Sequence, residues 1–108
     1  MTDLTDTLAE FAATLRELPA RTEATVRADV LDTLGCALAG RSAPGIASIT
    51  DVLAGWGGRE EAAVWGTGLR LPAPAAALAN GAAAHALDFD DTHDAAVVHA
   101  GVTVVPAA

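Results

Sequence analysis

Lysine and tyrosine are missing from this sequence, and cysteine occurs only once. The six arginines are outnumbered by fourteen acidic residues, so the formal net charge is −8. Nucleic-acid binding is disfavoured because no basic patch exists to displace counterions from a phosphate backbone. An anionic membrane surface is disfavoured for the same reason. An anionic small-molecule substrate would need cations that this sequence does not supply.

The single cysteine, Cys36, excludes a disulfide framework and fits a reducing compartment. It lies in the apolar helical pattern LDTLGCALAG, so we expect a buried structural thiol. The acidic start MTDLTDTLAEF lacks the basic segment of a signal peptide. The longest apolar run, LPAPAAALANGAAAHAL, is interrupted by Pro, Asn, Gly and His and predicts no transmembrane span. We therefore expect a cytoplasmic location and no membrane partner.

Aromatic residues make up only 4% of the 108 residues, although 52% of the chain is hydrophobic. Much of the apolar content is alanine, which buries little surface per residue, so we expect a thin core. The length suits one small domain. A chain of this kind is typical of helices that pack closely against something larger.

Apolar periodicity predicts an all-α fold with four complete helices. The expected helices cover residues 4–18, ended by Pro19; 22–40, with Thr22 as N-cap; 46–56, ended by two glycines; and 75–87. The fourth is apolar around most of its circumference and is predicted to be buried. The segment 62–71 admits one short β-hairpin. After Gly101, VTVVPAA predicts a helix that starts and is not completed, so we expect the 108 residues to be part of a longer domain.

Titratable chemistry is concentrated in HALDFDDTHDAAVVHAG, residues 85–101, which holds all three histidines and four aspartates: His85, His93, His99, Asp88, Asp90, Asp91 and Asp94. If the preceding helix continues, Asp88, Asp91 and Thr92 share a face. Aspartates buried together would raise one another's pKa, as acid–base catalysis near neutral pH requires. The alternative is that Asp90 and Asp91 cap the next segment and lie in water.

Two further interpretations of these side chains stay open. Histidine and aspartate can hold a divalent cation, but the spacing lacks the glycine and glutamate of an EF-hand and any HxxxH pair. No metal site is therefore predicted. His99 precedes an expected helix N-terminus, where free amides favour an anion, or else it is a loop residue without a special partner. Asn80 and Gly81, poor helix formers, are expected to serve a structural contact and a close helix crossing.

Three segments together resemble the N-terminal part of the MmgE/PrpD family: LDTLGCALAG, VWGTGLRLPAPAAALANGAAAHALDFDDTH and VVHAGVTVVPAA. The family includes 2-methylcitrate dehydratase, cis-aconitate decarboxylase and iminodisuccinate epimerase. The resemblance spans about Leu8 to Ala108 and implies the first part of an all-helical domain that packs with a second, α/β lid domain. It also implies a cytosolic homodimer that needs no metal or other cofactor. The implied substrates are small di- and tricarboxylates, and the implied chemistry is proton transfer next to a carboxylate with loss of water or CO2, or with inversion.

The resemblance also implies which residues act. Asp88 and His99 would be catalytic, Asp88 as an acid/base or orienting carboxylate and His99 by moving a proton or binding a carboxylate. Thr92 would donate a hydrogen bond to a substrate carboxylate. His85 and Asp91 would hold these side chains in position without contacting the substrate.

Two departures from the family pattern bear on that assignment. Ala100 stands where the family has a proline after the histidine, which loosens the backbone next to His99. The family's site also uses lysine, histidine and tyrosine residues from later in the chain, and this sequence contains neither lysine nor tyrosine. We therefore expect the intact protein to be an enzyme, whereas these residues carry half a site. The competing hypothesis is a non-catalytic stub or helical interaction module.

Overall fold

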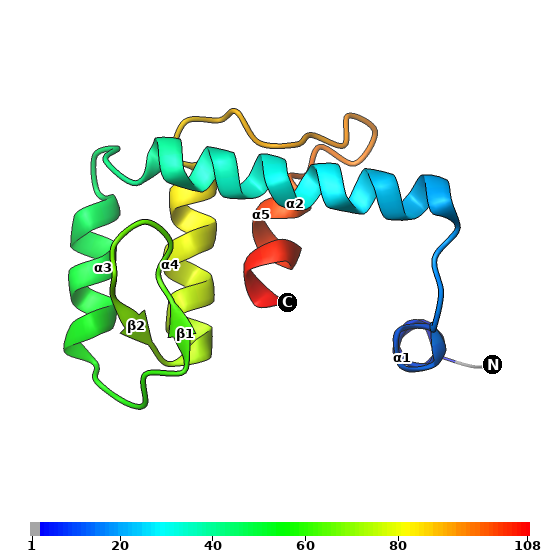
Figure 1. Cartoon of the computed structure of the whole chain (residues 1–108), viewed down its shortest axis with the longest axis horizontal. Helices are drawn as coiled ribbons and strands as arrows, with labels where there is room; N and C mark the ends of the chain where they lie inside the picture. Colours follow the sequence, from blue (N-terminus) through cyan, green and yellow to red (C-terminus); the bar gives the residue numbers. More distant parts are fainter. Residues whose placement is uncertain (1–2) are drawn as a thin grey trace.

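The computed structural model describes residues 3–108, and most of these residues are helical (Figure 1). The helices are α1 (Leu4–Thr14), α2 (Ala20–Gly40), α3 (Ile46–Gly55), α4 (Ala73–His85) and α5 (Gly101–Val104), followed by the 3-10 turn η1 (Val105–Ala107). Two short strands, β1 (Ala62–Ala63) and β2 (Arg70–Leu71), pair antiparallel with Ala62 opposite Leu71. The predicted all-α fold with one hairpin near 62–71 is confirmed.

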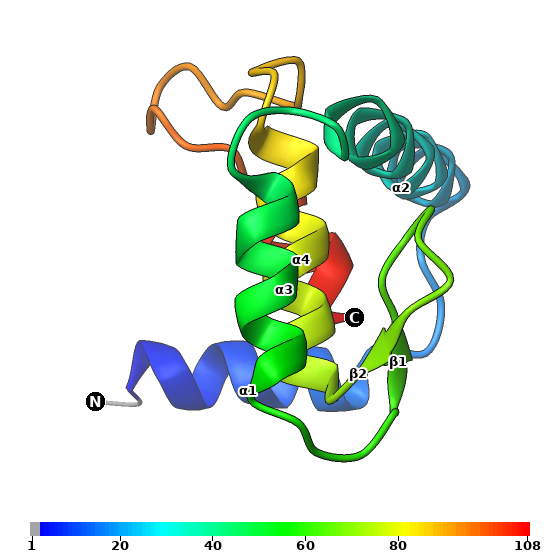
Figure 2. The ribbon, with the colours of Figure 1, turned by 90° about the vertical axis from the view of Figure 1, so that its left-hand side faces the viewer.

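Helix α4 forms the centre of the molecule and contacts α2, α3, the hairpin and α5. Figure 2 shows α3 and α4 side by side, with α2 crossing at their upper end. Close approach is possible because the crossing points carry glycine. A Cβ at Gly40 would collide with the carbonyl oxygen of Ala83, and one at Gly81 would lie 2.6 Å from the Val102 carbonyl oxygen. The predicted burial of this helix and the predicted crossing at Gly81 are both confirmed.

The core consists of two small clusters of buried side chains that α4 connects. One cluster contains Cys36, Ala37, Ile46, Ala83, Ala84 and Val102, and the other contains Leu53, Val64, Leu71, Ala76 and Ala79. Alanine makes up about half of both sets, so little area is buried per residue, as the composition predicts. The buried position of Cys36 is confirmed.

Asn80 fixes the hairpin against α4. Its side-chain oxygen accepts a hydrogen bond from the Trp65 amide at 2.9 Å, and its amide nitrogen donates to the Ala63 carbonyl at 3.0 Å. Both backbone groups would otherwise lack a partner in a hairpin only two residue pairs long. The predicted structural role of this polar residue is confirmed.

Several helix ends differ from the prediction, including the end of α4, which lies at His85 rather than Leu87. Helix α1 ends at Thr14, because Leu15 is already extended, although Leu18 continues the apolar spacing to Pro19. Helix α2 begins directly after Pro19, so Thr22 is not its N-cap. Helix α4 begins at Ala73 because Pro74 is accommodated in the first turn, where its missing N–H costs nothing.

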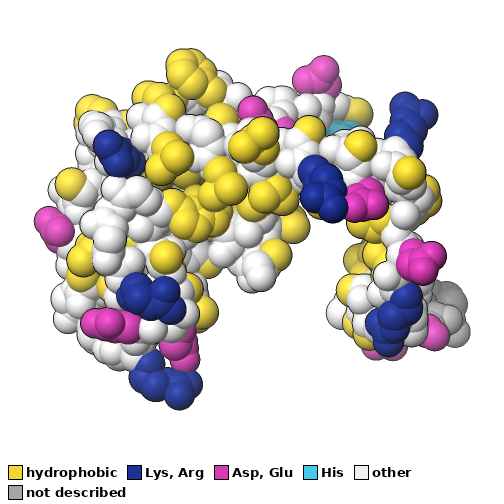
Figure 3. Space-filling view, viewed as in Figure 1, with side chains coloured by type: hydrophobic (Ala, Val, Ile, Leu, Met, Phe, Trp, Pro, Cys, Tyr) yellow, Lys and Arg dark blue, Asp and Glu magenta, His cyan; other side chains and the backbone are white. Residues whose placement is uncertain are grey.

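Helix α1 has no buried residue and stands apart from the other helices (Figure 1). Its apolar side chains Leu4, Leu8 and Phe11 are exposed. Figure 3 shows further apolar side chains over α2, and a wide gap between α1 and the rest of the molecule. No helix within residues 3–108 is both long enough and apolar enough to cross a membrane.

Candidate functional site

The loop of residues 86–100 carries the titratable side chains and begins where α4 stops, at His85. Asp88 turns the chain with a left-handed φ of 56°, a conformation that aspartate tolerates better than most residues, and its amide donates to the His85 carbonyl at 3.0 Å. The helix therefore does not continue through DFDDT. The prediction that Asp88, Asp91 and Thr92 share a helical face is wrong.

Asp90 is the buried centre of the site. Its side chain is 0% exposed, and the two carboxylate oxygens lie 3.2 and 3.0 Å from Nδ1 of His85. One of these oxygens also lies 3.1 Å from Nδ1 of His99. The alternative in which Asp90 caps a segment in water is wrong, because the reversal at Asp88 returns the chain to the end of α4.

His99 lies between two carboxylates of different exposure. Its Nδ1 faces the buried Asp90, and its Nε2 lies 3.8 Å from the carboxylate of Asp88, whose side chain is 80% exposed. The ring of His85 meets that of His99 edge to face, with centroids 4.7 Å apart. Four side chains, Asp88, His99, Asp90 and His85, thus form one continuous array that ends at the molecular surface. Three of them were candidates from the sequence.

Asp91 faces a different part of the structure. Its carboxylate accepts a hydrogen bond from the Gly101 amide at 2.9 Å and so caps α5. A Cβ at Gly101 would overlap this carboxylate, so the contact depends on glycine. The expected anion site at this helix start is therefore filled by the protein's own carboxylate. Thr92 is exposed, and within residues 3–108 its hydroxyl makes no hydrogen bond.

His93 is used locally and does not join the array. Its backbone amide donates to the Val98 carbonyl at 2.9 Å, and its Nδ1 accepts from the Ala96 amide at 3.1 Å. These contacts close a tight turn in which Val97 has a φ of 53°. Such a conformation is strained for a β-branched residue. The turn returns the chain to His99 beside the end of α4.

Among the clustered aspartates of the loop, nothing in the sequence distinguishes Asp90 as the buried one. It lies in an irregular loop, where neither a period of 3.6 nor a period of 2 indicates which side chain points inward. The one indication in the sequence is that no arginine lies within residues 85–101, where the three histidines are. A buried carboxylate there has only imidazole to pair with.

The four-residue array also offers metal ligands. One ligand atom from each of His85, Asp88, Asp90 and His99 can be chosen so that all lie within 4.8 Å of one another. Two imidazoles and two carboxylates suit a divalent transition metal. Because Asp90 already faces Nδ1 of both histidines, the same arrangement can also serve as an acid–base array without a cation.

Negative charge dominates the surroundings of the array. Within residues 3–108 its ion pairs involve only histidine as the cation, and the arginine pairs, Arg27–Glu23 and Arg59–Glu61, are exposed elsewhere. Burial raises the pKa of the Cys36 thiol, and Asp32, Asp90 and Asp91 raise it further. The Cys36 thiol is therefore protonated near neutral pH and is a poor nucleophile.

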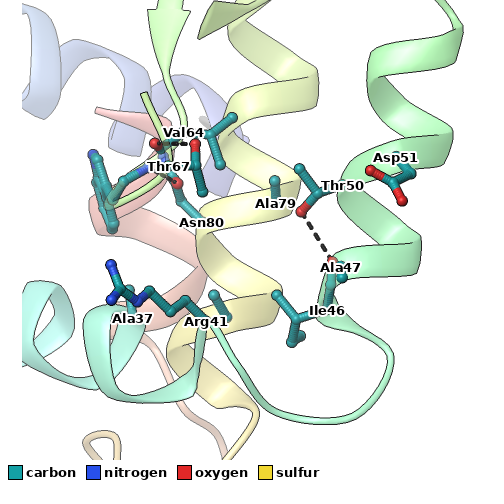
Figure 4. A pocket seen from close by; sticks show the side chains of 12 residues that line it. Ala37, Arg41, Ile46, Ala47, Thr50, Asp51, Val64, Thr67, Ala79 and Asn80 are labelled. Carbon is teal, nitrogen blue, oxygen red and sulfur yellow. Dashed lines mark hydrogen bonds between the residues drawn. The ribbon is translucent and has the colours of Figure 1, made fainter. Parts of the chain in front are cut away.

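A separate cavity of about 190 Å³ lies between α2, α3, α4 and the hairpin (Figure 4). Several of its polar side chains are turned toward backbone groups. Thr50 and Thr67 donate to the Ile46 and Val64 carbonyls, both at 2.9 Å, and Arg41 donates to the Gly66 carbonyl at 2.9 Å. Since these groups are already satisfied by the fold, the cavity offers less chemistry than the loop array.

Comparison with known protein families gives a match over most of the chain. Residues 6–108 match the model of the MmgE/PrpD N-terminal domain. Neither the curated proteins nor the solved structures gave a match. The matched range spans nearly the whole chain and includes all four residues of the array. This chain therefore belongs to the MmgE/PrpD family, with residues 6–108 corresponding to its N-terminal domain.

Proposed function

We propose that this chain supplies one wall of the active site of a lyase or isomerase acting on small di- or tricarboxylic acids. Family membership supports the reaction class, because the resemblance implies proton transfer next to a carboxylate with loss of water, loss of CO2 or inversion. The observation that carries the proposal is the array Asp88–His99–Asp90–His85, which runs from a buried carboxylate to an exposed one.

The geometry suggests a division of roles. Nε2 of His99 points toward the exposed end of the array, so it is the nitrogen placed to take a proton from, or return one to, a bound substrate. Asp88 lies beside that nitrogen as an orienting carboxylate or second acid/base group. Thr92 has a free exposed hydroxyl that can donate to a substrate carboxylate. Acid–base groups positioned in this way contribute roughly 10²–10⁴ in rate.

The charge of the chain requires a second wall. A substrate with two or three carboxylates would meet a chain of net charge −8, with only imidazoles in the array. We infer that cations from another protein surface close over Asp88 and Thr92. The resemblance implies lysine, histidine and tyrosine for that surface. It also implies a cytosolic homodimer without a metal or other cofactor.

Substitutions in the native protein test the assignment. Asp88→Asn removes a charge while keeping a residue that tolerates the left-handed conformation, and His99→Ala removes the proton carrier. We expect each to lower turnover of a responsive carboxylate at least a hundredfold, while circular dichroism stays unchanged. Asp94→Asn, in the same loop but outside the array, is the matched control and should keep full activity.

The assay uses 2-methylcitrate, cis-aconitate and iminodisuccinate, and follows alkene formation, CO2 release and loss of optical activity. Turnover close to wild type in both Asp88→Asn and His99→Ala would overturn the site assignment. Activity toward only one substrate would select among dehydration, decarboxylation and epimerisation.

The second candidate function is a helical interaction module without catalysis. Exposed apolar side chains on α1 and α2 favour it, since patches of this kind mark contact surfaces. It predicts a marginal, oligomerising or partner-dependent fold for the 108-residue chain and no response to any carboxylate. Circular dichroism melts and size-exclusion chromatography, with and without the three acids, separate the two functions.

A further inference from the structure

We propose that Asp90 is the positioning residue for His99: its buried carboxylate holds the proton on Nδ1, so that the Nε2 lone pair faces Asp88 and the substrate side. The catalytic consequence rests on the proposed function, whereas the arrangement of protons does not. Neither the resemblance nor the sequence pattern singles out Asp90 for this role.

The carboxylate of Asp90 needs hydrogen-bond donors because it is buried. The Asp90 side chain is 0% exposed, and a buried carboxylate must be paired with donors because leaving it alone is costly. Within residues 3–108 its side-chain partners are Nδ1 of His85 and Nδ1 of His99, and no arginine pairs with it. Asp90 therefore depends on the two imidazoles for its stability.

The Asp90 carboxylate sets the direction of its hydrogen bonds with the two imidazoles. An ionised carboxylate can only accept, so each facing imidazole nitrogen must carry a hydrogen. In a neutral imidazole a hydrogen on Nδ1 leaves the lone pair on Nε2. For His99 this nitrogen lies 3.8 Å from Asp88, on the exposed side of the array. The buried contact thus selects the nitrogen that can act as a base.

The ring of His99 is close to Asp90 but is not aligned with it for a hydrogen bond. Its Nδ1 is buried and lies 3.1 Å from Asp90, yet the angle is too poor for a hydrogen bond, and no other partner within residues 3–108 satisfies it. Catalytic hydrogen bonds are commonly loose before substrate binds and tighten in the complex. A rotation of the His99 ring toward Asp90 completes the bond and aims Nε2 at the substrate side.

His85 holds the carboxylate from the other side. It is the last residue of α4, and its Nδ1 contacts both oxygens of Asp90. The position of Asp90 is thereby tied to the most buried helix rather than to the loop alone. This tie compensates for Ala100, whose backbone is freer than the proline of the family pattern.

The test is a long-range ¹H–¹⁵N correlation spectrum of the native protein labelled in histidine, recorded near pH 8.5, where an ordinary imidazole is neutral. We expect Nδ1 of His99 at a protonated shift and Nε2 at an unprotonated shift, with the His99 signals assigned by their loss in His99→Ala. In Asp90→Ala nothing holds the proton on Nδ1, so the Nε2–H form should gain population. Asp94→Asn, an exposed carboxylate of the same loop, should leave the spectrum unchanged.

Asp90→Asn is the isosteric variant. The amide oxygen can still accept from both imidazoles, because a single Asp90 oxygen faces both Nδ1 atoms, but the amide carries no charge and presents donor hydrogens on its nitrogen. The Nδ1–H form of His99 should therefore lose population relative to wild type. Far-ultraviolet circular dichroism and a cooperative urea transition report that each variant is still folded. A wild-type His99 with its proton on Nε2 would overturn the proposal, even if every Asp90 variant failed to fold. An unchanged Nδ1–H form in folded Asp90→Ala would do the same.

Kinetics separate this inference from the proposed function. With a responsive carboxylate, Asp90→Asn should lower kcat by roughly 10²-fold or more and leave KM within about twofold, and Asp90→Glu should recover part of kcat. If the spectrum shows the expected tautomer but no carboxylate is turned over, the positioning role stands and the proposed function fails. If turnover is present and kcat of folded Asp90→Asn is unchanged, the positioning role is wrong.

Discussion

Asp90 and Asp91 are neighbours in the sequence, yet their side chains serve different parts of the structure. Asp90 points into the array with two histidines, and Asp91 caps α5 through the Gly101 amide. Each carboxylate is tied to an element that lies on its own side of the loop. At the residue scale the loop therefore works as a connector that fixes one catalytic candidate and one helix start at once.

The loss of stability expected at alkaline pH can be assigned to Cys36. Burial, and then Asp32, raise the pKa of this thiol above its ordinary value of 9.0. The unfolded chain ionises the thiol at a lower pH than the folded chain does, so the contribution of this thiol to stability is constant below about pH 8.5 and falls as the pH rises further. The chain has no lysine and no tyrosine, so no other side chain titrates in that range.

We therefore expect urea midpoints that decline above about pH 8.5 in wild type. In Cys36→Ala the midpoint should not decline over the same range. Native Cys36 should also react with iodoacetamide far more slowly than in urea. A decline that persists in Cys36→Ala would contradict the assignment.

At the scale of elements, the crossing of α2 and α4 depends on a single missing side chain. A Cβ at Gly40 would collide with the Ala83 carbonyl oxygen, which is part of a helix and cannot move aside, whereas a Cβ at Gly35 meets nothing within 4 Å. Both glycines lie in α2, so they form a matched pair.

We expect Gly40→Ala to lower the free energy of unfolding by about 1–3 kcal/mol, the usual cost of overpacking. Gly35→Ala should be neutral or raise it by up to about 1 kcal/mol, because alanine is the better helix former. Urea denaturation followed by circular dichroism measures both. Equal effects of the two substitutions would mean that the crossing has more room than the structure shows.

Element identity was largely predictable, whereas several helix ends were not. Three- and four-residue apolar spacing located α1 to α3, and the apolar run that follows Pro72 and Pro74 located α4. Leu15 and Leu18 continued the spacing past the true end of α1, since periodicity does not register a backbone that turns extended. The family pattern indicated Asp88 and His99 as candidates, and the structure brings both into one array. The left-handed Asp88 and the buried Asp90 follow from a loop conformation that no periodicity encodes.

At the scale of the whole molecule, the chain leaves many large apolar side chains exposed around a small core. Helix α1 contributes no buried residue, and about half of the residues in the two core clusters are alanine. Exposed apolar side chains lie on α1 and along α2, where Leu31 is 72% exposed, and others lie on α3 and in the loop of residues 86–100. Such a molecule is stable through the contacts of α4, and its outer faces are available for association.

Self-association of the 108-residue chain follows from that imbalance. We expect it to elute from a size-exclusion column above its monomer mass of 10.8 kDa, increasingly so at higher concentration. Leu8→Glu with Phe11→Glu should reduce the association without lowering the urea midpoint, because neither side chain is buried. Leu53→Ala, a core substitution, should instead lower the free energy of unfolding by about 2–5 kcal/mol. A chain that stays monomeric at every concentration would show that these apolar faces are tolerated by water, and the need for a covering surface would disappear.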